Sequence, residues 1–339
     1  MKSAKLSKTY LTSHVDASRW GLAALRSNYN DERRETGVKT FMAPHVSVIL
    51  PYYEGDKWLL KSVDSVRSQE DLSFEIIVVD DGSSRPAAPI LSTLADDRIR
   101  AVRIPHAGKG AALNEGARMA RADVLCFIDQ DDLMNANRLR LQYSAFFRHP
   151  RIDAVYSDYE RVGENGMSID VVMCRQATND ECLHQMAIGR GLVTMQTLMI
   201  RKETFWKIGG FSEDIYLTGL DDAEFFARLF TSNVVLAYVP GIVQKWVDHG
   251  KNYMKSESFH KARLILLEHL EELALKNAMT RKELPYFRYH TYYMRGLYAL
   301  EHGQPEEAIS QWWRAIIARP FRVDAYYMLI KSFLRKLLK

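Results

Sequence analysis

The sequence of 339 residues has few cysteines, no long apolar run and little net charge. Its three cysteines, Cys126, Cys174 and Cys182, show no CxxC or metal-ligand spacing, which favours free thiols in a reducing compartment. No segment approaches the roughly 20 apolar residues that span a bilayer, and the lysines near the start precede no apolar run, so we expect no signal peptide. A net charge of +4 does not indicate nucleic-acid binding. We therefore expect a cytoplasmic protein, at most peripheral at the inner face of the plasma membrane.

What the sequence does contain is an apolar run that ends at a cluster of carboxylates. Strand formers occupy 125–128, and Asp129, Asp131 and Asp132 follow at once. Carboxylates this close repel one another unless a cation lies between them. At the end of a buried strand in an open α/β sheet they would face the ligand crevice, and such oxygen ligands suit Mg²⁺ or Mn²⁺ shared with substrate phosphates. The alternative is that Asp131 or Asp132 caps a helix starting near Leu133.

The pattern of apolar residues divides the chain into three regions. Residues 1–44 are polar and mixed, and they read as an N-terminal extension to which we assign no chemistry. Residues 45–255 alternate strands with helices, which predicts a mostly parallel, doubly wound α/β sheet. From 256 to 339 the strands vanish and helical periodicity takes over, so we expect a C-terminal α-helical appendage.

Local patterns give a first set of elements. The expected strands cover 46–50, 75–79, 99–104, 125–128, 153–157, 192–200 and 234–238. The expected helices in the same region cover 57–69, 88–95, 111–121, 137–147, 202–208 and 223–230. Residues 158–173 are expected to form an antiparallel excursion, and residues 244–258 a loop.

The helical region contains one legible repeat. Residues 293–308 look like a tetratricopeptide helix pair, in which Gly296, Gly303 and Ala308 are small enough for two helices to pack closely. Pro320 stands where such a repeat ends. A stable solenoid needs about three repeats, so we interpret 256–339 as an appendage and not as a full repeat domain.

Six stretches in the middle region occur in a distinctive order. They read Val-Ser-Val-Ile-Leu-Pro-Tyr-Tyr (46–53), Val-Val-Asp-Asp-Gly-Ser (78–83), Gly-Lys-Gly-Ala-Ala-Leu-Asn-Glu-Gly (108–116), Asp-Gln-Asp-Asp (129–132), Gly-Gly-Phe (209–211) and Gly-Leu-Asp-Asp-Ala-Glu-Phe-Phe-Ala-Arg-Leu (219–229). In this order they resemble the family 2 inverting glycosyltransferases of the GT-A (Rossmann-like) fold. The resemblance covers roughly Val46 to His249.

The resemblance implies a nucleotide site at the ends of the first two strands. The family holds the base at the first strand end, here Pro51, Tyr52, Tyr53 and Glu54. The family usually has Thr before the Tyr, so which tyrosine makes the contact stays open. A surface turn is the alternative. Asp80 or Asp81 looks like the carboxylate that accepts hydrogen bonds from base and ribose, although one of the two could only cap the turn that follows.

Lys109 lies between two glycines at the start of an expected helix. Backbone amides and the helix dipole favour an anion there, and the lysine adds a positive charge. We place Lys109 near the nucleotide or its diphosphate, with a solvated loop lysine as the alternative. The stretch matches neither the dinucleotide fingerprint nor the P-loop, which removes the main support for those two cofactor classes.

The resemblance also assigns the metal. Asp129 and Asp131 look like the family's Asp-x-Asp pair, in which Asp131 is the first candidate ligand for Mn²⁺ or Mg²⁺ and Asp129 more naturally meets the ribose. His249 resembles the late histidine that closes over the diphosphate or completes the metal shell, and Lys251 is a weaker candidate for the same task. The alternative for His249 is an exposed loop histidine.

Asp221 and Asp222 align with the family's Glu-Asp motif, with Asp in place of Glu. Asp222 would be the general base, taking a proton from the acceptor hydroxyl as that oxygen attacks the anomeric carbon from the face opposite the diphosphate. The alternative is an acidic first turn of the helix at Ala223, where Asp is favoured anyway. Arg228 would steady this helix or pair with Asp221.

We therefore expect a metal-dependent inverting glycosyltransferase that uses a nucleoside-diphosphate sugar, with UDP as the favoured base, and a glycan or lipid-linked glycan acceptor. The basic, apolar stretch 331–339 would allow a peripheral membrane contact if it forms an amphipathic helix. Two other functions stay open. One is a catalytically silent scaffold that binds partners through the helical tail. The other is a phosphohydrolase using Asp129 and Asp131, although that class expects Thr or Val where Leu133 stands.

Overall fold

The structure, a computed structural model, describes residues 43–217, 219–250 and 256–337. The described residues cluster into a single unit from Ala43 onward, and a division at residue 255 stays a prediction. Most of the predicted extension 1–44 lies outside the described residues, as do Lys251 and the last two residues of the tail.

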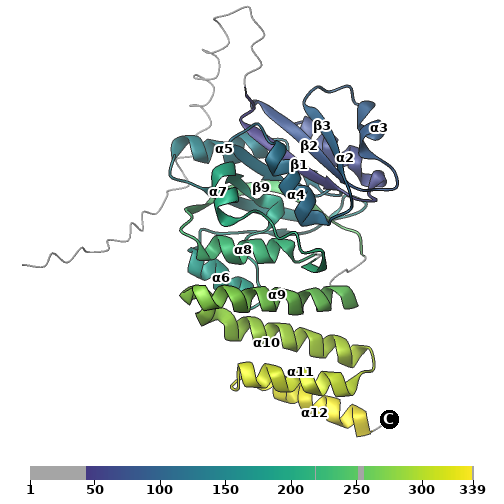
Figure 1. Ribbon diagram of the computed structural model, residues 1–339, viewed down its shortest axis with the longest axis vertical. Coiled ribbons are helices and arrows are strands. Elements are labelled where there is room, and N and C mark those ends of the chain that lie inside the picture. The colour runs from purple at the N-terminus through teal and green to yellow at the C-terminus, as the bar shows by residue number, and fades with distance from the viewer. Residues whose placement is uncertain (1–42, 218, 251–255, 338–339) are drawn as a thin grey trace, which may run out of the picture. The chain divides into compact units, whose positions relative to one another are not determined.

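This unit contains a nine-stranded mixed sheet, which lies in the upper part of Figure 1. The main path runs β3-β2-β1-β4-β8-β6-β9-β5, and β7 pairs with β6 outside that path. Parallel ladders join β3, β2, β1 and β4, and a further one joins β6 to β9, while β5, β7 and β8 run antiparallel to their neighbours. The strands are β1 (Val46–Tyr52), β2 (Phe74–Asp81), β3 (Ile99–Ile104), β4 (Val124–Phe127), β5 (Leu133–Met134), β6 (Ala154–Gly163), β7 (Ser168–Val172), β8 (Met199–Arg201) and β9 (Leu236–Asp248).

The helices that cover the sheet pack closely against its strands. Every residue of β1 and β2 is buried, as a strand with helices on both faces requires. A Cβ atom on Gly116 would come within 2.4 Å of the Ile49 side chain. Glycine at this position therefore lets helix 109–119 lie directly on β1. The helices are α2 (Asp56–Arg67), α3 (Ala87–Ser92), α4 (Lys109–Met119), α5 (Arg138–Arg148), α6 (Asn179–Ala187), α7 (Lys202–Ile208) and α8 (Asp221–Thr231), with single 3₁₀ turns η2 (Met195–Thr197) and η3 (Ile215–Leu217). The predicted α/β class is confirmed.

Three local predictions were wrong. The segment 192–200 is not one strand, because it contains the turn η2 before the short strand β8. No helix starts near Leu133, since β5 lies there and α5 begins at Arg138. The segment that starts at Gln244 is not a loop, because β9 continues to Asp248.

The polar end of β9 is buried because its side chains pair with other buried polar groups. Gln244 accepts a hydrogen bond from Arg138 and donates one to Asp132 Oδ2 at 3.2 Å, and all three side chains are buried. The amide of Val247 donates to Asp132 Oδ1 at 3.0 Å. Asp132 therefore holds β9 against the end of β4 and caps no helix.

The C-terminal helices lie one after another beyond α8 (Figure 1). They are α9 (Glu257–Lys276), α10 (Ala278–Glu301), α11 (Pro305–Ala318) and α12 (Val323–Leu337). Leu267 and Leu270 of α9 and Phe287 of α10 share the hydrophobic core of the sheet. At Gly296 an added Cβ would lie 2.9 Å from the Trp312 ring, so the predicted close helix pair is confirmed. Among the described helices, none is long and apolar enough to cross a membrane.

Candidate active site

Two glycine motifs far apart in the chain lock together beside the sheet. A Cβ on Gly110 would lie 2.0 Å from the carbonyl oxygen of Ser212, so only glycine permits this approach. Asn114 accepts a hydrogen bond from the amide of Phe211 and donates one to its carbonyl, both at 2.9 Å. Gly210 has a φ of +67°, which favours glycine. The contact places the first turn of α4 beside the loop that leads into α8.

Lys109 lies among three carboxylates. It is the first residue of α4, and its Nζ lies 2.7 Å from Asp129 Oδ1. Burial lowers the pKa of Lys109, but the charges of Asp129, Asp221 and Asp222 outweigh it, so that the pKa is raised. Gln196 of η2 donates to Asp129 Oδ2 at 3.0 Å. Lys109 is thus a charged member of the site and not a solvated loop lysine.

Asp221 and Asp222 form the first turn of α8, so the helix position and the site position coincide. Asp221 is buried, and its Oδ2 has no hydrogen-bond partner among the described residues. Burial raises the pKa of Asp221, opposed by Lys109 and supported by Asp129. Burial, and then the charge of Asp221, raise the pKa of Asp222 to about 6. Asp222 is half-buried, and it is the more accessible of the two carboxylates.

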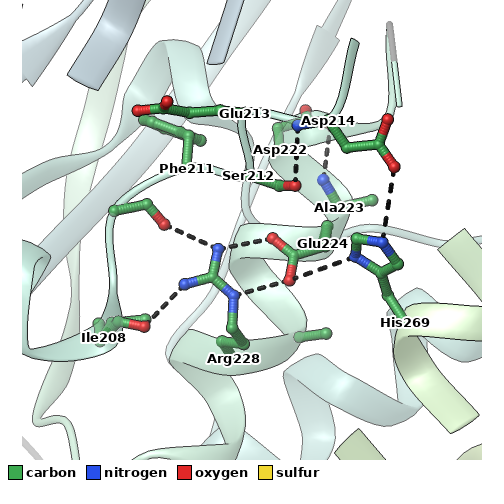
Figure 2. A network of polar contacts seen from close by, with 12 residues as sticks. Ile208, Phe211, Ser212, Glu213, Asp214, Asp222, Ala223, Glu224, Arg228 and His269 are labelled. Atoms are coloured by element: carbon green, nitrogen blue, oxygen red, sulfur yellow. Dashed lines mark hydrogen bonds and ion pairs between the residues drawn. The ribbon is translucent and has the colours of Figure 1, made fainter. Parts of the chain in front are cut away.

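Figure 2 shows how α8 is anchored. Arg228 pairs with Glu224 of the same helix, so the expectation that Arg228 steadies α8 is confirmed, and the alternative pairing with Asp221 is wrong. The same guanidinium donates to the carbonyl oxygens of Ile208 and Gly210, each at 2.7 Å. His269 of α9 lies 4.0 Å from Glu224 and 3.7 Å from Asp214. The helix that carries Asp222 is therefore fixed both to the Gly-Gly-Phe turn and to the C-terminal helical region.

A second polar group lies where the chain leaves β9. His249 Nε2 lies 2.8 Å from Asp131 Oδ2, and its Nδ1 lies 3.2 Å from Glu164 Oε1 in the β6–β7 hairpin. The Trp58 ring packs against the imidazole, with 4.6 Å between the centroids. Burial, and then the charge of Asp129, raise the pKa of Asp131. His249 is therefore held on three sides and is not a free loop histidine.

Asp131 and His249 offer a carboxylate oxygen and an imidazole nitrogen side by side, which is a donor pair that suits Mg²⁺ or Mn²⁺, and their role as metal ligands stays a prediction. Among the described residues there is no group of three or more acidic, His or Cys side chains suited to a metal. Magnesium typically uses one or two protein carboxylates together with substrate phosphates and water. A metal ligand that is histidine usually donates its other ring nitrogen to a carboxylate, the place that Glu164 occupies. Asp129 faces Lys109 and Gln196, and its role as a metal ligand stays a prediction.

Tyr52 and Tyr53, at the end of β1, differ in burial, which bears on the question of which tyrosine contacts a base. Pro51 and Tyr52 are buried in the strand, where Tyr52 donates its hydroxyl to the Arg85 carbonyl at 3.0 Å, so the surface-turn alternative is wrong for them. Tyr53 is 46% exposed and stacks on His106 with 4.3 Å between the ring centroids. Glu54 is exposed and accepts a hydrogen bond from Ser84. Tyr53 is therefore the solvent-accessible tyrosine of the two, and its contact with a base stays a prediction.

Asp80 and Asp81 lie at the end of β2, and both are buried. Asp80 accepts hydrogen bonds from the amides of Ser83 and Ala87, at 2.8 and 3.0 Å. Asp81 binds the glycine-rich loop through the amide of Gly108 at 3.0 Å. The two carboxylates hold the loops that border the site, and direct contact with a base or ribose stays a prediction.

Four side chains of the site were missed at the sequence level. They come from the loop before α4, from η2, from α2 and from the β6–β7 hairpin: His106, Gln196, Trp58 and Glu164. No local pattern marks them, because each meets its partner across a long sequence separation. The one available signal was the position of His106 directly before the glycine-rich loop.

Family models now place this arrangement among known proteins. Residues 47–208 match the model described as Glycosyl transferase family 2, and residues 189–252 match the N-terminal domain of galactosyltransferase. The two matches run from β1 to the residues just past His249. These matches support the assignment of this region to the family 2 glycosyltransferases of the GT-A fold.

Two proteins named as glycosyltransferases are similar to this chain in sequence. The UDP-Glc:alpha-D-GlcNAc-diphosphoundecaprenol beta-1,3-glucosyltransferase WfgD of Escherichia coli is 28% identical over 173 residues, which cover 51% of this chain and 67% of that protein. An uncharacterized glycosyltransferase of Rickettsia felis is 25% identical over 249 residues, and the match covers 72% of this chain but 41% of that protein. The chain therefore spans less than half the length of the Rickettsia relative.

Solved structures agree with the fold. A fragment of S. aureus TarS, 1-349, superimposes with a TM-score of 0.60 at 18% identity, covering 85% of this chain and 88% of that chain. The same fragment in complex with UDP-GlcNAc gives a TM-score of 0.60 at 19% identity, with 85% and 89% covered. At this level of identity the likeness concerns the fold.

Proposed function

We propose that the protein is a metal-dependent inverting glycosyltransferase that moves a sugar from a UDP-linked donor to a hydroxyl of a glycan or lipid-linked acceptor. One observation carries the proposal: Lys109, Asp129 and the Asp221–Asp222 pair converge from three separate elements, with Asp131 and His249 beside them. The related TarS fragment was solved with UDP and with UDP-GlcNAc, and the name of WfgD specifies UDP-Glc, which supports UDP as the nucleotide.

The donor would lie between the ends of β1, β2 and β4. Tyr53 and His106 offer stacked aromatic surfaces for a base. Lys109 stands at the first turn of α4, where free amides and the helix dipole favour phosphate oxygens. When a diphosphate enters, the Lys109 ammonium exchanges part of its contact with Asp129 for the new anion. Asp129 would then be available to the ribose.

The metal would be held by Asp131 and His249, with Glu164 fixing the imidazole. Bound there, Mn²⁺ or Mg²⁺ neutralises charge on the nucleoside diphosphate leaving group. The protein side chains alone leave Asp131 partly buried beside Asp129, which is the reason for its raised pKa. A cation would relieve that repulsion.

Asp222 is the residue proposed to activate the acceptor. With a pKa of about 6 it is mostly ionised at neutral pH, yet basic enough to accept a proton from a hydroxyl as the oxygen attacks. The proton passes from the acceptor hydroxyl to Asp222, the oxygen forms the new bond to the anomeric carbon, and the bond to the diphosphate breaks. One displacement from the opposite face inverts the anomeric centre.

The competing functions have less support from the geometry. A phosphohydrolase would need Asp129 as a free nucleophile, but its carboxylate is engaged by Lys109 and Gln196. A silent scaffold gives no reason for the raised pKa of Asp222, or for the Asp221 oxygen that has no hydrogen-bond partner within 43–217, 219–250 and 256–337. The scaffold also predicts that nucleotide binding does not depend on metal.

Calorimetric binding of UDP and GDP, with and without Mn²⁺, tests the proposal. We expect the wild type to bind UDP in preference to GDP, and Asp131→Ala to lose the part of the affinity that depends on Mn²⁺. Asp170→Ala, which removes an exposed carboxylate on β7, is the matched control and should bind like the wild type. Absence of metal-linked binding of either nucleotide would contradict the proposal and favour the scaffold.

A further inference from the structure

Helix α12 has two apolar faces, and only one of them is packed within the chain. Ala325, Met328, Leu329 and Ser332 are buried, and the first three belong to the hydrophobic cluster formed with α10 and α11. On the opposite side the large apolar side chains are exposed, from 38% at Tyr326 to 82% at Leu337. They are Val323, Tyr326, Tyr327, Ile330, Phe333, Leu334 and Leu337, and together we call them the outer face of α12.

The width of the outer face distinguishes possible occupants. At about 100° per residue, its seven side chains fill an arc of roughly 120°. A seam for one partner helix needs a narrower stripe with spacings of three and four, which Val323, Tyr327, Ile330, Leu334 and Leu337 alone would provide. Tyr326 and Phe333 widen the face beyond such a seam. Phe321, 96% exposed in the turn before α12, adds another ring.

The charged residues of α12 after its first turn are all basic, whereas Asp324 in the first turn pairs with Arg322. From 325 to 339 the sequence contains Lys331, Arg335, Lys336 and Lys339 and no Asp or Glu. Lys336 pairs with Glu306 at 2.9 Å, and Arg335 donates to the Leu300 carbonyl, so these two also tie α12 to its neighbours. Lys331 is exposed beside the arc. A wide apolar face with aromatic residues and a basic border complements an anionic membrane surface.

We propose that the outer face of α12 is a docking surface for an anionic phospholipid bilayer. The helix lies in the plane of the interface with its apolar side chains among the acyl chains, while Lys331 meets the headgroups. The sequence placed a membrane contact at 331–339, and the structure enlarges it to the whole length of α12. The inference stands on the outer face alone and does not depend on the proposed transfer reaction.

Co-sedimentation of the full chain with vesicles tests the docking surface. Phosphatidylcholine vesicles with phosphatidylglycerol should bind the wild type, and vesicles of phosphatidylcholine alone should bind it more weakly. Ile330→Glu and Leu334→Glu should each weaken binding by at least about tenfold, because a charge then enters the apolar layer. Leu275→Glu is the matched control: Leu275 is 77% exposed on α9, away from the outer face, and its variant should bind like the wild type. Added salt and Lys331→Glu should reduce the preference for phosphatidylglycerol.

The outcomes separate this proposal from the others. Wild-type protein that stays in solution with phosphatidylglycerol vesicles overturns it, and so does Leu334→Glu that sediments like the wild type. If light scattering shows a dimer that Leu334→Glu dissociates, and no vesicle binding is seen, a second copy covers the face and the membrane proposal is wrong. UDP binding, measured on every variant, reports separately on the donor site and on folding.

Discussion

Two Asp-Asp pairs in this protein have the same sequence but opposite surroundings. The pair at the end of β2, Asp80 and Asp81, is buried, and each of its four carboxylate oxygens accepts a hydrogen bond from the chain. The pair at the start of α8, Asp221 and Asp222, has raised pKa values and one buried oxygen that finds no hydrogen-bond partner in the described part of the chain.

The difference in hydrogen bonding distinguishes a structural pair of carboxylates from a pair suited to proton transfer. At β2 the donors are backbone amides and the guanidinium of Arg103, so the negative charge is used to fix loops. At α8 the nearby charges are Lys109 and Asp129, and the cost of burial is left partly uncompensated. Uncompensated acids in a cleft are typical of functional sites, because their protons move near neutral pH. A dipeptide motif alone does not separate the two cases.

The largest effect is expected from removing the base at α8. Asp222→Asn should lower kcat by about 10²–10⁴-fold, because the amide cannot accept the proton of the acceptor hydroxyl. UDP affinity should stay unchanged, since Asp222 is not placed against the diphosphate. Release of UDP from the donor and calorimetry of UDP binding measure the two quantities. A variant that retains more than about a tenth of the wild-type kcat would remove Asp222 from the role of base.

The pH profile gives a control for that result. Because Asp222 must be ionised, kcat/KM should fall about tenfold per pH unit below pH 6 and level off above it. Asp221→Asn removes the like charge that helps to raise the pKa of Asp222, so the acid limb should shift to lower pH. An acid limb that does not move in Asp221→Asn would show that the two carboxylates do not interact.

The corresponding substitution at the end of β2, Asp80→Asn, should lower the stability of the fold. In Asp80→Asn one oxygen becomes an NH₂ group that faces an amide donor, and the contact with Arg103 loses its charge. We expect a loss of about 3 kcal/mol in the free energy of unfolding, measured by urea denaturation. Asp170→Asn on the exposed strand β7 should stay within about 0.5 kcal/mol of the wild type. A loss below about 1 kcal/mol for Asp80→Asn would mean that these hydrogen bonds do not hold the loop.

Glu164 combines features of the two Asp-Asp pairs, because its carboxylate both fixes a neighbouring group, the imidazole of His249, and lies at the proposed site. Glu164→Gln keeps a hydrogen-bonding group but removes the charge that faces the imidazole at 3.2 Å. If Asp131 and His249 hold Mn²⁺, the affinity for Mn²⁺ in the presence of UDP should fall by about 10–100-fold. Electron paramagnetic resonance of free Mn²⁺ measures it. Glu160→Gln, on the preceding strand β6, is the control, and an unchanged affinity in Glu164→Gln would show that His249 needs no such support.

Much of this fold was predictable because local signals agree with the tertiary structure. Strands β1, β2 and β4 are apolar runs that end in polar residues, and β3 is a run of apolar residues interrupted by Arg100 and Arg103. Each of the four was located within about two residues of its bounds. The site residues Lys109, Asp131 and Asp222 follow from strand ends and helix starts, where parallel sheets place ligands. In the structure Lys109 contacts Asp129 and Asp131 contacts His249, while the binding of a metal or a base by these residues stays a prediction.

The parts that escaped prediction depend on long-range pairing. The end of β9 appeared to be a loop because Gln244 and Lys245 are polar, and nothing local reveals that Gln244 is buried between Arg138 and Asp132. The turn η2 was predicted as part of a strand because residues 192–200 alternate loosely, yet Gln196 in this turn donates a hydrogen bond to Asp129. Glu164 and Trp58 could not be predicted as site residues, because only the tertiary structure brings the β6–β7 hairpin and α2 beside His249.

The smallest effect expected is also the one that separates the two pairs by sign. The folded pKa of Asp222, about 6, lies above its ordinary value of 3.8, so ionisation favours the unfolded state. This penalty is absent below pH 3.8, grows as the pH rises, and is complete above about 6. Asp222→Asn should therefore stabilise the fold at pH 7.5 by on the order of 1 kcal/mol, after allowance for the partial exposure of the side chain. The gain should vanish at pH 4, as urea denaturation at both pH values would show, whereas Asp80→Asn destabilises at pH 7.5. A destabilised Asp222→Asn at neutral pH would place this carboxylate with the structural pair at β2.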